Sequence, residues 1–181
     1  MSAFRQLVLL LLLFVTVPMA AVAAERTLAV TVDDLPVNSI QRDLPTQRAI
    51  TEDLVAALVR AGVPAIGFVN EGKLDVDGAV EPARRALLQH WLDVGLELGN
   101  HGYAHLDINR TPLDEYQRDI LRGERVTRPL MTAAGKQLRY FRHPYLHAGE
   151  DRETRDALRA FLAEHDYREA PVTIDNSDRL A

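Results

Sequence analysis

Three short polar motifs in this chain contain the residue types of a metal-dependent hydrolytic site. In chain order they are Asp33-Asp34, His101-Gly-Tyr-Ala-His105 and Arg142-His-Pro-Tyr145. A carboxylate and two imidazoles can hold a divalent metal ion. A second carboxylate beside the first can accept a proton from metal-bound water, and an arginine can orient that carboxylate. The ordered set, more than any single motif, indicates one site.

The two carboxylates of Asp33-Asp34 directly follow the apolar, β-branched run Leu28–Val32. Neighbouring side chains on a strand point to different sides. One carboxylate can therefore bind a metal while the other faces the substrate. A solvated turn or a helix cap is the alternative interpretation of such a pair, and the strand-like run before it favours the site.

His101 and His105 are four residues apart, after the weaker apolar run Leu96–Leu98. If the segment turns helically, their side chains lie roughly 5–6 Å apart on one face and can grip one ion. Two histidines and one aspartate, with an open position for water, form the ligand set of a catalytic zinc site. The alternative is a pair of unrelated surface or core histidines. We assign no role to His90, which fits an amphipathic helix.

Arg142 follows the strand-like residues Tyr140-Phe141 and precedes Pro144-Tyr145. Its guanidinium can hold Asp33 ionised and aimed, although in an arginine-rich chain an ordinary surface role is the competing interpretation. The backbone N–H of Tyr145 can in principle face a developing oxyanion.

Composition limits the class of partner. The formal net charge is −5, no basic cluster is present and the chain has no cysteine. We therefore expect neither nucleic acid nor an anionic membrane as a partner. Without thiolates, any metal must be held by histidine and carboxylate ligands.

The first 24 residues are expected to be a secretory signal peptide. Arg5 precedes the apolar run Leu7–Val15, and the small residues Ala20–Ala24 follow. A basic start, a short apolar core and an A-x-A-like end are typical of such a signal. A membrane anchor is the alternative, but the apolar run is short for a span. We expect a periplasmic or secreted protein whose residues 25–181 form one domain.

Strand-like and helix-like segments alternate along residues 25–181. The expected strands are Leu28–Val32, Val63–Val69, Leu96–Leu98, Leu138–Phe141 and Pro171–Ile174. The expected helices are Pro45–Ala61, Glu81–Val94, Thr111–Ala134 and Asp151–His165. Such alternation predicts an α/β fold with a parallel sheet. The three motifs then follow the first, third and fourth strands, at the carboxyl ends where sites of such folds lie.

Two helices carry more detailed expectations. In the first, Ile50, Leu54, Leu58 and Ala61 recur at helical spacing and are expected to face inward. In the third, Thr111 is expected to cap and Pro112 to occupy the first helical position.

With these residues considered, the chain resembles the polysaccharide deacetylases of carbohydrate esterase family 4, the NodB-homology domain. The resemblance covers roughly Leu28 to Asp178. It implies a distorted (β/α) barrel, here incomplete with about five of the expected strands. It also implies removal of N- or O-acetyl groups from sugars, an acetylated carbohydrate as substrate and a divalent metal, often zinc.

Site roles follow from the same resemblance. The family's first motif matches Val32-Asp33-Asp34, which implies that Asp33 is the catalytic base and Asp34 a metal ligand. The family's H-[ST]-x-x-H motif is similar to His101–His105 and implies that both histidines are ligands, with Gly102 replacing the usual hydroxyl residue. The R-x-P-Y-type motif resembles Arg142–Tyr145, which implies the arginine that orients the base and the tyrosine on the oxyanion side.

The fourth and fifth motifs of the family match less well. Asp175 and Asp178 fit D-x-x-D-W, but Arg179 stands where tryptophan is expected, and the chain ends at Ala181. The fifth motif, which supplies a histidine as general acid, is missing, and His147 is a candidate substitute. We therefore expect a truncated deacetylase whose activity is lost or reduced. The alternatives are an inactive metal- or sugar-binding remnant and a hydrolase of small amides.

Overall fold

A computed structural model describes residues 28–41 and 43–175 of the chain. The expected signal peptide at residues 1–24 lies outside the described residues, and so do Asp178 and Arg179. Within the described part, no helix combines the length and the apolar character needed to cross a bilayer.

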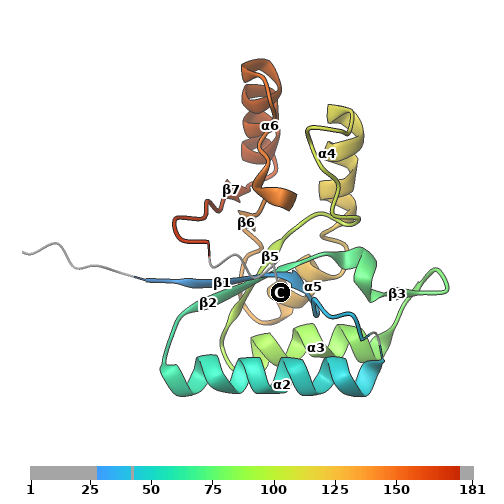
Figure 1. The fold of residues 1–181 in the computed structure, drawn as a ribbon, viewed down its shortest axis with the longest axis vertical. Helices are drawn as coiled ribbons and strands as arrows, with labels where there is room; N and C mark the ends of the chain where they lie inside the picture. The colour runs from blue at the N-terminus through green and yellow to red at the C-terminus, as the bar shows by residue number, and fades with distance from the viewer. Residues whose placement is uncertain (1–27, 42, 176–181) are drawn as a thin grey trace, which may run out of the picture.

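The described residues form a five-stranded parallel sheet with helices around it (Figure 1). The strands lie in the order β1, β2, β5, β6, β7, with bounds Val30–Leu35, Ala65–Val69, Glu97–Asn100, Tyr140–Phe141 and Arg168–Glu169. The helices are α2 (Leu44–Ala61), α3 (Pro82–Asp93), α4 (Leu113–Arg122), α5 (Thr127–Ala133) and α6 (Arg152–Glu164). The predicted α/β class with a parallel sheet is confirmed. The sheet is open in this part of the chain, with β1 and β7 at its two edges.

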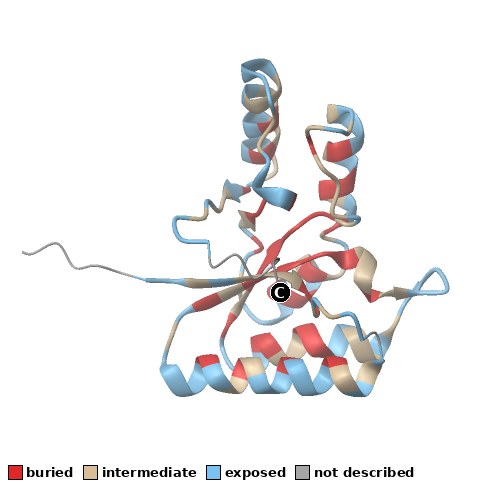
Figure 2. Ribbon diagram, in the orientation of Figure 1, coloured by how far each residue is buried: buried red, intermediate tan, exposed pale blue. Residues whose placement is uncertain are grey.

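Four of the five helices form two pairs. α2 and α3 run side by side on one side of the sheet, while α4 and α6 contact each other and stand beyond it (Figure 1). The buried residues gather along the central strands and on the helix faces that meet them (Figure 2). Phe68 on β2, Leu98 on β5 and Trp91 on α3 are almost completely buried. This core holds the carboxyl ends of the strands in fixed positions.

The first strand is longer than predicted and includes the aspartate pair. β1 runs to Leu35, so Asp33 and Asp34 lie within it instead of after it. Its pairing with β2 is irregular between Val32 and Leu35, and Asp34 has a φ of 68°. The irregularity is a physical reason for the difference, because a strand can bend at a bulge and continue beyond it.

The predicted inward face of the first helix is partly wrong. Ile50 is 38% exposed and Ala61 is exposed, whereas Thr51, Val55 and Leu58 are buried. α2 begins after Asp43, whose carboxylate accepts a hydrogen bond from the backbone N–H of Thr46.

The predicted helix Thr111–Ala134 is wrong as a single element. α4 ends at Arg122, and α5 starts at Thr127. The break has two causes: Gly123 packs against the backbone of Gly102, and the carboxylate of Glu71 accepts hydrogen bonds from the N–H groups that open α5. Pro112, not Thr111, occupies the N-cap position of α4, and it provides no side-chain cap.

The predicted last strand, Pro171–Ile174, is also wrong. β7 lies earlier, at Arg168–Glu169, and pairs with Tyr140 and Phe141 of β6. Pro171 has no N–H to donate to a ladder, so pairing stops after Ala170 donates to the carbonyl of Phe141. Three further elements were not predicted: the short 3₁₀ helix η1 (Glu71–Leu74) and the two strands of a hairpin, β3 (Asp75–Val76) and β4 (Ala79–Val80).

Candidate metal and hydrolytic site

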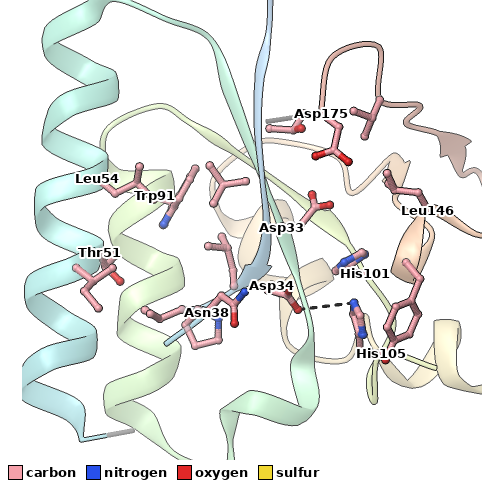
Figure 3. A pocket seen from close by; sticks show the side chains of 18 of the residues that line it. Asp33, Asp34, Asn38, Thr51, Leu54, Trp91, His101, His105, Leu146 and Asp175 are labelled. Atoms are coloured by element: carbon pink, nitrogen blue, oxygen red, sulfur yellow. Dashed lines mark ion pairs between the residues drawn. The ribbon is translucent and has the colours of Figure 1, made fainter. Parts of the chain in front are cut away.

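Three predicted ligands converge at the carboxyl edge of the sheet. Asp34, His101 and His105 each offer one ligand atom, and these atoms all lie within 4.8 Å of one another. Asp34 lies near the end of β1, and both histidines follow β5, which is separated from β1 by β2 in the sheet. In Figure 3 the Asp34 and His105 side chains face each other, with Nε2 of His105 3.8 Å from Oδ1 of Asp34.

The two histidines meet without a helix between them. The segment after β5 is an irregular turn in which Gly102 and His105 have φ values of 76° and 56°. The ring centroids of His101 and His105 are 4.9 Å apart with the rings edge to face. The two histidines are close, as the sequence predicted, but the predicted helical turn between them is absent.

Each histidine is kept neutral by burial. His101 is 2% exposed, and desolvation lowers its pKa to about 4. Nδ1 of His101 lies 2.8 Å from the backbone oxygen of Arg142. Because a carbonyl only accepts, Nδ1 carries the proton and Nε2 retains its lone pair. Burial also lowers the pKa of His105, although the nearby Asp34 opposes the shift.

Asp34 is held by Lys73, a residue outside the three sequence motifs. Nζ of Lys73 lies 3.0 Å from Oδ1 of Asp34 and donates to its backbone oxygen at 2.9 Å. Burial alone would raise the pKa of Asp34, but the Lys73 ammonium and its hydrogen bond bring that pKa below the usual value. A signal existed in the sequence: Lys73 follows β2, so it too lies beyond the carboxyl end of a strand.

Asp33 turns to a different partner. Its Oδ2 lies 3.2 Å from Nη1 of Arg142, and Nη2 of Arg142 donates to Oγ1 of Thr31 at 3.2 Å. The guanidinium also lies over the ring of Phe68, 4.7 Å from its centroid, and Arg142 is 2% exposed. The buried guanidinium therefore occupies a fixed place next to Asp33.

Tyr145 lies beside His105, whereas His147 pairs with a residue outside the ligand cluster. The Tyr145 ring is 4.6 Å from that of His105, edge to face, and the residue has a φ of 58°. Nδ1 of His147 is 2.8 Å from Oδ1 of Asp107. His147 is not among the residues that line the cavity described next.

A cavity of about 560 Å³ opens over these groups. Asp33, Asp34, His101 and His105 lie along one part of its wall (Figure 3). Another part is mainly apolar and includes Leu54 and Trp91, and Asp175 lines the cavity as well. A cavity that combines a cluster of ionisable groups with an apolar wall is typical of a binding site for a small group.

A family model described as polysaccharide deacetylase matches residues 21–168. The chain belongs to the polysaccharide deacetylase family. That membership confirms the family to which the three motifs pointed.

Solved structures agree with the family's fold. A family 4 carbohydrate esterase from Streptomyces lividans, in complex with acetate, matches with a TM-score of 0.61 and 22% identity, over 87% of this chain and 68% of that one. A chitin deacetylase from the fungal pathogen Colletotrichum lindemuthianum matches with a TM-score of 0.61 and 23% identity, over 84% and 57%. A family 4 pseudoenzyme from Bacillus anthracis matches with a TM-score of 0.61 and 15% identity, over 87% and 47%. This polysaccharide deacetylase chain thus spans between about half and two thirds of these proteins.

Proposed function

We propose that this protein is a metal-dependent deacetylase that removes N- or O-acetyl groups from a polysaccharide or another acetylated carbohydrate, with zinc as its metal. One observation carries the proposal: three ligand atoms of Asp34, His101 and His105 lie within 4.8 Å of one another, beside an Asp33–Arg142 pair. Family membership supports a carbohydrate acetyl group as the target.

The donor set fits a divalent ion. Two neutral imidazoles and one carboxylate match the ligands of catalytic zinc sites, which leave a position open for water or substrate. The hydrogen bond from Nδ1 of His101 to the Arg142 carbonyl is the outer support that such ligands usually have. When bound, the ion would polarise the acetyl carbonyl and lower the pKa of water towards about 7.

The remaining groups would handle protons and charge. Asp33 would take the proton of the attacking water, and Arg142 would keep the Asp33 carboxylate ionised and aimed. The backbone N–H of Tyr145 would stabilise the oxyanion of the tetrahedral intermediate.

A second candidate function is an inactive metal- or sugar-binding protein. One of the solved neighbours is a pseudoenzyme, and among the described residues that line the cavity the only histidines are the two proposed ligands, His101 and His105. General acid catalysis contributes about 10²–10⁴-fold, so its loss would reduce turnover severely. Hydrolysis of a small amide at the same site is a third possibility.

Acetate release from zinc-loaded protein tests these functions. We expect release from acetylated oligosaccharides by the wild type and loss of release in Asp33→Asn with zinc retained. The exposed Asp53 on α2 provides a matched control, since Asp53→Asn should leave activity unchanged. If the wild type binds zinc but releases no acetate, the proposed deacetylase activity is refuted and the proposal of an inactive metal- or sugar-binding protein is supported. Release from small amides alone would support the third function.

We also propose that the protein acts in the periplasm or outside the cell after removal of residues 1–24. The charged start, apolar run and small residues of that segment support this. N-terminal sequencing of exported protein should find a start at about Ala24 or Glu25. An intact Met1 on the exported protein would contradict it.

A further inference from the structure

We infer that Asp119 is a positioning residue that holds the turn His101–His105 in the shape needed for both histidines to reach one ion. The inference rests on the proposed metal site. It concerns a buried carboxylate on α4, 9% exposed, that lines no part of the cavity.

The turn needs an outside support because it has no regular structure of its own. Residues 101–105 belong to neither a helix nor a strand, and His105 has a positive φ. The N–H of His101 donates to the carbonyl of Val69 on β2, but the backbone N–H groups that follow it depend on other acceptors. Asn100 supplies the first, since its Oδ1 accepts from the N–H of Gly102 at 2.7 Å.

Asp119 supplies the next two acceptors. Its Oδ2 accepts from the N–H of Tyr103 at 2.9 Å, and its Oδ1 accepts from the N–H of Ala104 at 3.0 Å. The N–H of Tyr103 is shared with the backbone oxygen of Asp119 at 3.2 Å, so the bond to Ala104 depends on the side chain alone. These two N–H groups lie midway between the two histidines. Both oxygens of one carboxylate are thus used on the turn, and charge-assisted bonds of this kind are stronger than neutral ones.

Gly102 and Gly123 show how closely α4 approaches the turn. A Cβ on Gly102 would lie 2.6 Å from Oδ2 of Asp119, so the carboxylate fills the space that a side chain at position 102 would take. A Cβ on Gly123 would lie 2.6 Å from the carbonyl carbon of Gly102. The helix end therefore rests directly on the backbone of the turn. This accounts for glycine at position 102, where the family motif has a hydroxyl residue.

The first test is isosteric substitution of Asp119. In Asp119→Asn only one oxygen remains to accept, and the new NH₂ would face an N–H donor. We expect zinc affinity to fall by about 10–100-fold, as is typical when an outer support of a metal ligand is removed. The visible absorption spectrum of the cobalt-substituted protein should also change, because that spectrum reports ligand geometry. Asp114→Asn, which alters a carboxylate of α4 that is 71% exposed, should change neither quantity.

A double substitution tests whether Asp119 and residue 102 compete for the same space. Gly102→Ser and Asp119→Ala should each weaken zinc binding, the first because its Cβ meets Asp119 and because a φ of 76° strains any residue other than glycine. In the double variant the serine enters the space that the carboxylate has left, so we expect less loss than the product of the two single losses.

Three results decide the inference. Wild-type zinc affinity and an unchanged cobalt spectrum in both Asp119→Asn and Asp119→Ala would overturn it. Independent, multiplying losses in the double variant would overturn the claim about position 102. Absence of zinc binding by the wild type would instead refute the proposed function, and with it any role of Asp119 in positioning metal ligands.

Discussion

The backbone oxygen of Arg142 lies 2.8 Å from Nδ1 of His101 and accepts a hydrogen bond from it. The guanidinium of the same residue contacts Asp33. The main chain of Arg142 thus supports a proposed ligand, while its side chain supports the proposed base. Because these two contacts use different parts of one residue, substitutions can separate them.

Replacing Arg142 by lysine should reduce turnover and leave the metal in place. Lysine lacks the planar fork that reaches both Asp33 and Thr31, but it retains the carbonyl that accepts from His101. We expect kcat for acetate release to fall by at least about tenfold, with zinc affinity within about threefold of wild type. The exposed Arg139 gives a control, Arg139→Lys. Parallel loss of zinc and activity would contradict this separation.

Removing the carboxylate of Asp34 should abolish stoichiometric zinc binding. The wild type should bind about one zinc ion per chain, because three ligands and an open position form a complete site. Asp34→Ala would leave only two imidazoles, and we expect almost no zinc after dialysis. Metal analysis of both proteins, with Asp53→Ala as a control, checks this. Equal zinc content in wild type and Asp34→Ala would show that the ligands lie elsewhere.

Replacing Lys73 by methionine should strengthen zinc binding. The ammonium lies 3.0 Å from Oδ1 of Asp34, so it competes with the metal for that oxygen and repels the ion. We expect an affinity gain on the order of tenfold, which corresponds to about 1.4 kcal/mol. Lys136, which donates to the carbonyl of Gly95 before β5 begins, gives the control Lys136→Met. Unchanged or weaker binding in Lys73→Met would mean that the lysine mainly shapes β1.

His143 should make the metal-free protein less stable at mildly acidic pH. Its Nε2 lies 2.9 Å from Oε1 of Glu169, while its buried Nδ1 has no hydrogen-bond partner among the described residues. Burial lowers the pKa of His143, although Glu169 opposes the shift. As the pH falls below the unfolded pKa of about 6.5, the unfolded chain therefore binds a proton at residue 143 that the folded chain does not. The free energy of unfolding then decreases as the pH is lowered.

Urea unfolding in the presence of a chelator measures this effect. Between pH 7.5 and 5.5, the wild type should lose more free energy of unfolding than His143→Gln, in which the titrating ring is absent. An identical loss in the two proteins would show that His143 does not contribute.

Much of the fold could be predicted because its determinants are local. The alternation of apolar runs with helical periodicity placed β2, α3 and α6 well, and glycine marked the end of α2. The proximity of Asp34, His101 and His105 was also predictable, since side chains beyond the carboxyl ends of parallel strands share one edge.

The features that were missed depend on contacts distant in sequence. Gly123, the C-cap of α4, is a local signal for a helix end, but a glycine within a helical run does not by itself require a break. The contact of Gly123 with the backbone of Gly102 cannot be seen in the sequence. The cap of α5 is Glu71, from another part of the chain. Lys73 and Asp119 likewise act on partners that only the folded chain brings near them.

The three proposed ligands lie on segments that are distant in sequence, one at the first strand of the sheet and two beyond its third. This chain has no cysteine and so can form no disulfide. An ion bound between the three ligands would instead act as a reversible cross-link between these segments. Heat resistance should therefore rise with the free zinc concentration, even in a variant that lacks all catalytic power.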